Sequence, residues 1–192
     1  MIKLIDLLEA KQVGDIYHFT SINALYDMLL LSNTIILDSD FASHAAGGYY
    51  SFTRNPNLDF STDVFNNIGG NYKSHARLKL DGDKMSHKYK FEPYVDVTSD
   101  EENSFVKNSE SFEAEERISA KYGKIDLVPY ILELQIVNPK TVMDFYPSGT
   151  PLRKEILKEY AKVIEWFTQH NIPIKYTDKS TAASTRVVDK HR

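Results

Sequence analysis

The chain contains no cysteine, which excludes disulfide bonds and metal sites built from thiolate ligands. It also lacks any apolar run near the roughly 20 residues that span a bilayer, so we expect no membrane partner. The first residues, Met1–Asp6, show no small-residue cleavage site of the kind that ends a signal peptide. Together these absences favour a reducing compartment, and we expect a cytoplasmic protein.

Several motifs of common enzyme classes are absent as well. The sequence has no G-x-x-x-x-G-K-[ST] loop, no G-x-G-x-x-G turn and no G-x-S-x-G elbow. Its 6 histidines do not follow the H-E-x-x-H spacing of zinc enzymes. Kinase, P-loop and Rossmann-type functions therefore lack support, and the sequence predicts no metal.

The overall charge is weakly acidic. A formal net charge of -4 over 192 residues creates no global field that attracts nucleic acid or an anionic membrane, although it leaves room for a local basic patch. The hydrophobic fraction of 42% is ordinary for a soluble globular protein. The 12 tyrosines suit stacking on flat ligands, but tyrosine also packs well in half-buried sheets.

Residue patterns predict an α+β protein. Apolar, β-branched and aromatic runs predict strands at 16–19, 34–37, 49–53, 76–80, 130–137 and 172–176. Helical spacing predicts helices at 2–11, from 22 onward and at 151–169, with Thr20 or Ser21 as a cap and Pro151 in a first turn. We expect a turn at Asp81-Gly82, a long loop at 92–111, and a mostly antiparallel or mixed sheet, because strands and helices do not alternate regularly.

His18 is the first candidate for a functional site. It lies in the run Tyr17-His18-Phe19-Thr20, just before a helical pattern. If Tyr17 and Phe19 face the core, the imidazole faces the other way and can bond a ligand hydroxyl or carboxamide with one nitrogen. The alternative is a partly exposed strand histidine that bonds a neighbouring carbonyl.

Two further segments offer polar chemistry. Arg54 ends the strand that begins at Tyr49 and can pair with a phosphate, while Tyr50 can stack on a planar ring. In the acidic run 113–117, a glutamate that anchors a ribose hydroxyl can stabilise positive charge developing at the anomeric carbon. The alternatives are a plain strand with a surface arginine and a solvated helix face.

In this order, the three segments resemble the ADP-ribosyltransferase superfamily. The strand-then-helix run at 17–20 is similar to bacterial toxins that modify nucleic acid and to phage proteins. The phage proteins are also similar at Ser51–Asn55, Leu80–Lys84 and Glu113–Ile118. The resemblance covers about residues 14–137. Chain length predicts one domain, which we place over 1–176 as ADP-ribosyltransferase-like, and the composition of 177–192 predicts a loose tail.

The resemblance implies a split mixed or antiparallel sheet of ADP-ribosyltransferase type, flanking helices and a cleft for NAD as co-substrate. The second glutamate of an E-x-E motif anchors the nicotinamide ribose, which points to Glu115, with Glu116 as runner-up because strand register decides. His18 binds a ribose hydroxyl or the nicotinamide amide. The implied site residues are Glu113, Glu115 and Glu116 for catalysis, and His18, Thr20, Tyr49, Tyr50, Ser51, Thr53 and Arg54 for NAD.

The implied reaction is loss of nicotinamide through an oxocarbenium-like state, followed by capture of the ADP-ribose by an acceptor that the 92–111 loop selects. The net charge favours a protein acceptor over a nucleic acid, in the host cytoplasm if the chain is phage-encoded. The first alternative is a non-catalytic host-takeover or anti-defence protein on the same scaffold. The second is an RNA phosphate-removing transferase, which needs several positioned arginines, with Arg54 and Arg77 as candidates.

Overall fold

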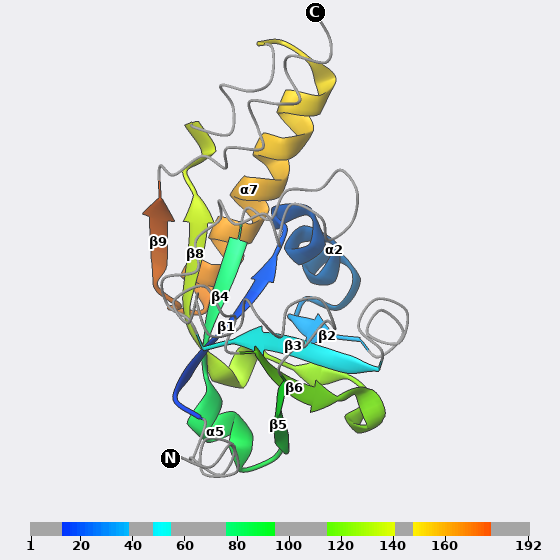
Figure 1. Cartoon of the computed structure of the whole chain (residues 1–192). Helices are drawn as coiled ribbons and strands as arrows, with labels where there is room; N and C mark the ends of the chain where they lie inside the picture. The colour runs from blue at the N-terminus through cyan, green and yellow to red at the C-terminus, as the bar shows by residue number, and fades with distance from the viewer. Residues whose placement is uncertain (1–12, 39–47, 55–75, 95–114, 141–147, 178–192) are drawn as a thin grey trace, which may run out of the picture.

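The computed structural model describes residues 13–38, 48–54, 76–94, 115–140 and 148–177 (Figure 1). Its elements, in chain order, are β1 (Asp15–Thr20), α2 (Ile22–Ser32), β2 (Ile36–Leu37), β3 (Tyr49–Thr53), β4 (Ala76–Asp81), α5 (Gly82–Ser86), β5 (Phe91–Tyr94), β6 (Glu115–Ser119), η1 (Ala120–Tyr122), β7 (Ile125–Asp126), η2 (Val128–Tyr130), β8 (Ile131–Val137), α7 (Pro151–Gln169) and β9 (Ile174–Thr177). Within this part of the chain, no helix is long and apolar enough to cross a membrane.

The main sheet has seven strands in the order β5-β6-β3-β1-β4-β8-β9. Neighbouring strands are antiparallel except for β8 and β9, which are parallel. A parallel pair needs a crossover connection, and α7 supplies it. The predicted α+β class with a mostly antiparallel sheet is therefore confirmed. A separate two-stranded sheet joins β2 to β7.

The sheet is joined weakly at its middle. β1 pairs with β4 over the whole of Asp15–Thr20, but it pairs with β3 only at Tyr17 and Thr53. Figure 1 shows β3 running across the direction of β1. The sheet thus divides at this seam into one part made of β1, β4, β8 and β9 and another made of β3, β6 and β5.

One face of the sheet carries the hydrophobic core. Leu78 and Leu80 on β4 and Leu134 on β8 are fully buried, and they belong to one cluster with apolar residues of α2 and α7. Arg77 and Lys79 alternate with the leucines and lie on the other face. Buried and partly exposed residues therefore alternate along β4, as expected for a strand with one face on the core.

Both long helices begin at capped positions. The Ser21 side chain accepts a hydrogen bond from the Ala24 amide at the start of α2, and Thr150 caps α7 in the same way. α7 spans the predicted 151–169 with Pro151 in its first turn. Two of its apolar residues, Leu152 and Leu157, are exposed.

One local prediction was wrong, and one alternative is excluded. Asp81-Gly82 is not a simple turn, because the Asp81 side chain caps the short helix α5. On β8, Leu132 is exposed where the pairing with β4 shifts register between Lys79 and Leu80. The end of the acidic run forms strand β6 rather than a solvated helix.

Some predictions lie partly or wholly outside the described residues. The first part of the expected 92–111 loop belongs to β5, and the rest of it falls outside. The expected helix at 2–11, nearly all of the tail at 177–192 and Glu113 also fall outside.

Candidate functional site

His18 lies on the face of the sheet that carries the core. In the β1–β4 ladder it is opposite Leu78, and Ile16 is opposite Leu80. Both leucines and Ile16 are fully buried. The condition considered from the sequence, with the imidazole on the face away from the core, is therefore not met in this register. Tyr17 lies on the opposite face, where its ring is 4.6 Å from the Arg77 guanidinium.

The backbone of β3 holds the His18 ring. Its Nδ1 lies 3.2 Å from the Ser51 carbonyl oxygen, across the seam where β1 and β3 share one backbone pair. A carbonyl only accepts, so this bond requires the proton on Nδ1. Burial lowers the pKa of His18 and favours the neutral ring. Nε2 then offers a lone pair, and no residue in the described part of the chain bonds it.

Glu116 faces the same side of the sheet as His18. It is opposite Phe52 in the β3–β6 ladder, and its side chain has no exposed surface. Glu115 is opposite Thr53, in the register of the other face. Its side chain is not among those that the structure describes. Register therefore favours Glu116 over Glu115 as the partner of His18.

Glu116 forms an ion pair with Arg54, the residue that follows β3. Arg54 Nε lies 2.8 Å from Glu116 Oε1, and the arginine side chain is 36% exposed. The contact lacks hydrogen-bond alignment, and neither carboxylate oxygen has a hydrogen-bond partner among the described residues. Native structures rarely leave a buried carboxylate in this state, because its desolvation is then uncompensated.

The environment of Glu116 changes its acidity. Burial raises the pKa of Glu116 to about 7, and the positive charge of Arg54 only partly opposes this shift. A carboxyl group that titrates near neutral pH beside a specific charge partner is typical of functional sites. Of the charged residues on this face, Glu116 and Arg54 are thus the strongest candidates for chemistry.

Register joins these residues into one row. His18 on β1 is the neighbour of Phe52 on β3, with ring centroids 5.6 Å apart, and Phe52 is opposite Glu116 on β6. Two inter-strand spacings place the backbones of His18 and Glu116 about 10 Å apart. This spacing is about the length of a nucleoside, and the buried ring of Phe52 lies between the two side chains. The sequence argument missed Phe52, although its alternation with Ser51 and Thr53 indicated a different face.

The other predicted site residues do not all join this row. Tyr50 is buried in the core, and its hydroxyl donates to the Gly123 carbonyl at 2.6 Å. Tyr49, Ser51 and Thr53 alternate to the opposite face. Thr20 shares the face of His18 and is opposite Ala76, whereas Arg77 and Arg54 lie on different faces.

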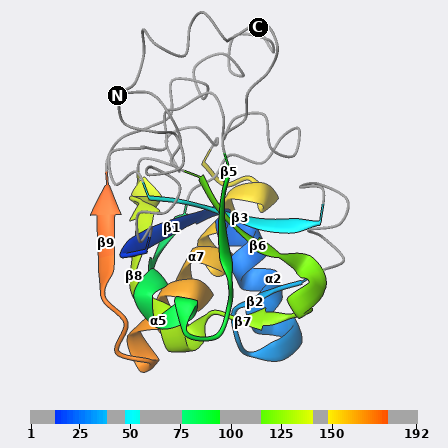
Figure 2. The same cartoon turned by 60° about the horizontal axis from the view of Figure 1, so that its bottom comes forward.

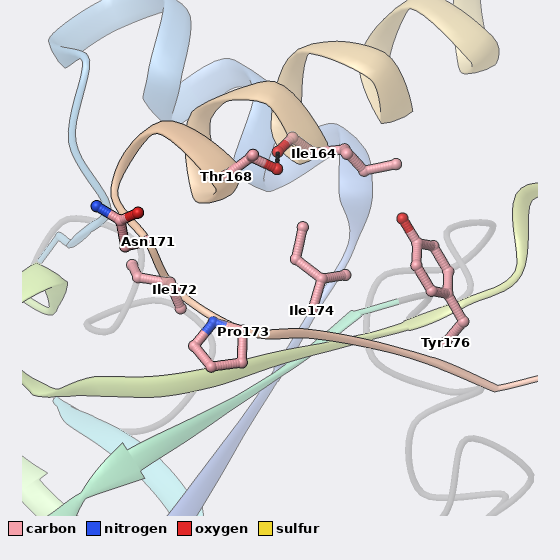
Figure 3. A pocket seen from close by; sticks show the side chains of 7 residues that line it. All are labelled: Ile164, Thr168, Asn171, Ile172, Pro173, Ile174 and Tyr176. Carbon is pink, nitrogen blue, oxygen red and sulfur yellow. Dashed lines mark hydrogen bonds between the residues drawn. The ribbon is translucent and has the colours of Figure 1, made fainter.

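A shallow groove lies elsewhere, between α7 and β9 (Figure 3). Its volume is about 440 Å³, and Ile164, Ile174 and Tyr176 line its apolar walls. The Thr168 hydroxyl faces the groove but donates to the Ile164 carbonyl, as the dashed line shows. The lining contains no charged side chain, and β9 is far from β6 in the strand order. This groove therefore contributes no chemistry to the row.

No family model and no curated protein matches the chain. The register, burial and charge of the site therefore carry the functional conclusion. The described side chains can supply a neutral imidazole acceptor, a partly exposed arginine and a buried carboxyl group on one face of the sheet.

Proposed function

We propose that the chain is an NAD-dependent ADP-ribosyltransferase and that Glu116 is its key carboxylate. The observation that carries this proposal is the buried Glu116, with a pKa raised to about 7, in one row with His18. The split between β1 and β3 supports it, because the resemblance in the sequence implies a divided sheet. NAD is the co-substrate, and the acceptor is a protein or a nucleic acid of the host.

In this proposal Glu116 and His18 contact the nicotinamide half of NAD. The Glu116 carboxylate accepts a hydrogen bond from a hydroxyl of the nicotinamide ribose, and it stabilises the positive charge that develops at the anomeric carbon. The carbon–nitrogen bond to nicotinamide breaks, and its electron pair leaves with nicotinamide. An acceptor oxygen or nitrogen then attacks the same carbon and releases its proton to water. His18 Nε2 accepts from a ribose hydroxyl or from the carboxamide.

Arg54 serves two purposes in this scheme. Its buried Nε faces Glu116, and in this proposal the rest of the guanidinium of the 36% exposed side chain pairs with the NAD diphosphate. Arg54 also lowers the cost of ionising Glu116, because an adjacent positive charge favours the carboxylate. Binding of NAD and activation of Glu116 therefore depend on the same side chain.

Mutation of the glutamates tests the proposal. We expect Glu116→Gln to lower NAD hydrolysis or transfer of labelled ADP-ribose by about 100-fold or more, because a neutral amide stabilises the developing charge poorly. Glu133→Gln, on a half-buried residue of β8, is the control and keeps activity. If Glu115→Gln abolishes turnover and Glu116→Gln does not, the assignment of Glu116 is wrong.

The pH profile gives a second test. Because the ionised form of Glu116 is the active one, kcat/KM for NAD rises with pH and levels off above an apparent pKa near 7. His18 is already neutral over this range, since burial lowers its pKa, so it adds no second limb above neutral pH. A profile that falls between pH 6 and pH 8 contradicts the role of the carboxylate.

One observation favours a second function, a non-catalytic interaction protein on this scaffold. Glu116 has no exposed surface, and the Arg54 contact and Phe52 lie against it, so the carboxylate is not open to a ligand in this structure. NAD separates the two functions. A rise in melting temperature with NAD, lost in Arg54→Met, supports the transferase, whereas no shift and no turnover supports the interaction protein.

A further inference from the structure

Lysines gather at one end of the molecule despite the net negative charge of the chain. Five of the 23 lysine and arginine residues fall in two short segments, 84–90 and 119–124, and neither segment contains an acidic residue. The first segment covers α5 and the turn into β5, and the second covers η1. Figure 2 shows these elements at the lower end of the view, with β5 between them.

The two segments meet through tyrosine rings. The Tyr122 hydroxyl accepts a hydrogen bond from the Lys90 amide at 3.2 Å. The rings of Tyr89 and Tyr122 pack edge to face with centroids 5.4 Å apart, and Tyr130 lies 6.2 Å from Tyr89 on its other side. Lysines from both segments therefore share one surface around three aromatic rings.

The ammonium groups stand over this tyrosine cluster. Lys84 Nζ is 5.8 Å from the centre of the Tyr130 ring, and Lys88 Nζ is 5.2 Å from that of Tyr89. Lys84, Lys88, Lys90 and Lys121 are all exposed. Tyr122 keeps 46% of its surface exposed, so a flat ligand can reach its ring. The surface thus offers positive charges beside one open aromatic face.

Acidic neighbours reduce this charge only in part. Glu92 lies 3.6 Å from Lys90 in an exposed pair, and Asp38 pairs with Lys124, so Lys124 is not part of the surface. The attraction within an exposed ion pair of this kind is weak, so the lysine can exchange its acidic partner for a phosphate. Two further acidic residues lie nearby in the chain, Asp83 on α5 and Asp126 on β7. Among the described contacts, Lys121 has no acidic partner.

We propose that Lys84, Lys88, Lys90 and Lys121, together with the open ring of Tyr122, form a docking surface for single-stranded nucleic acid. Ammonium groups neutralise phosphates, and an exposed aromatic ring stacks on an unpaired base. Duplex DNA offers no free base to Tyr122, and an acidic protein segment does not carry a flat ring beside every negative charge, as a nucleic acid strand does. A single strand therefore uses both features of the surface.

This inference rests on the proposed function only where it identifies the acceptor of ADP-ribose. β6 connects the two sites, since Glu116 lies on this strand and Lys121 follows it in η1. At about 3.3 Å per residue, the strand between Glu116 and Ser119 is about 10 Å long. A bound strand can therefore reach from the lysines toward the glutamate, which shifts the expected acceptor from protein to nucleic acid.

Fluorescence anisotropy with the full chain tests the surface without NAD. The probes are labelled single-stranded DNA and RNA of about 16 nucleotides, the matching duplex and a polyglutamate peptide. We expect the single strands to bind best. In the combined variant Lys84→Ala, Lys88→Ala and Lys121→Ala, the slope of log affinity against log salt should decrease by about 2. Tyr122→Ala should weaken binding about fivefold or more, because it removes one stacking partner.

A matched control removes the same charge elsewhere. Lys154→Ala, Lys158→Ala and Lys162→Ala change three lysines of α7 and should leave affinity within about twofold, because these residues lie outside the surface. Equal weakening in both triple variants, or tighter binding of polyglutamate, overturns the proposal. If the first triple variant fails to fold, the single variants Lys88→Ala and Lys121→Ala test the surface in its place. Glu116→Gln should bind the single strand normally, so loss of catalysis and loss of docking are distinguishable.

Discussion

At the scale of the residue, the buried Glu116 lowers the stability of the folded protein at neutral and higher pH. Its carboxyl group is fully buried, and its pKa is raised from 4.5 to about 7 because desolvation outweighs the pull of Arg54. The folded protein therefore keeps a proton that the unfolded chain releases. Stability from this group is complete below pH 4.5 and is lost as pH rises to about 7, by an amount on the order of 3 kcal/mol.

We predict that Glu116→Gln removes this dependence. The amide cannot ionise, so the variant should be more stable than the wild type at pH 8 and should differ less from it at pH 5. Two other groups also make stability depend on pH. Because burial lowers the pKa of His18, this residue makes the folded state less stable as pH falls below 6.5, the opposite of the effect of Glu116. The pKa of Glu159 is raised, so Glu159, like Glu116, makes the folded state less stable as pH rises. Both groups remain in the variant, so the difference between the two proteins isolates Glu116.

Urea denaturation from pH 5 to pH 8 measures this difference. The matched control is Glu165→Gln on the exposed surface of α7, which should follow the wild-type curve. A Glu116→Gln curve that runs parallel to the wild type contradicts a raised pKa at this position.

At the scale of the element, α5 depends on a close approach between two glycines. The Gly82 amide donates to the Gly14 carbonyl at 2.9 Å, which connects the start of α5 to the turn before β1. A Cβ atom built on Gly82 would lie 2.5 Å from that oxygen. Gly82 is therefore required by packing, although it occupies a helix where alanine has the better intrinsic propensity.

We predict that Gly82→Ala destabilises the protein by about 1–3 kcal/mol, because backbone at Gly14 has to move. Thermal denaturation followed by circular dichroism should show a lower melting temperature. Ser86→Ala in the same helix is the control, and its loss of one exposed hydrogen bond should cost less. A Gly82→Ala variant as stable as the wild type would show that the turn before β1 yields easily.

At the scale of the whole molecule, the seam between β1 and β3 separates two parts of the sheet that can unfold independently. β4 pairs along most of its length with both β1 and β8, whereas β3 meets β1 at one position. The His18 bond to the Ser51 carbonyl adds a side-chain link at the same place. The β3–β6–β5 part can therefore open without breaking the other ladder.

Hydrogen exchange at native conditions checks this division. Leu78 on β4 and Ile118 on β6 are both fully buried, so burial alone predicts similar protection. We expect the β6 amides to exchange through an opening of lower free energy than the β4 amides. Equal opening free energies would mean that the sheet unfolds as one unit despite the seam.

Local patterns in the sequence were sufficient for much of the fold. Alternation at 76–80 predicted β4, helical spacing and Pro151 predicted α7, and Ser21 was an expected cap. These features depend on neighbours within a few residues, so the chain alone contains the information. The order of strands and the single pair at the seam depend on contacts between distant segments, which local patterns do not contain.

The sequence by itself determined that the chain has no thiolate chemistry, that it forms an α+β domain, and that a histidine, an arginine and a group of glutamates are its candidate site residues. Only the tertiary structure decided which of them converge. A shift of one residue in a strand moves every side chain to the other face, so register placed Glu116 rather than Glu115 in the row of His18. The acidity of Glu116 and the meeting of the two lysine segments are likewise effects of neighbours brought together by folding.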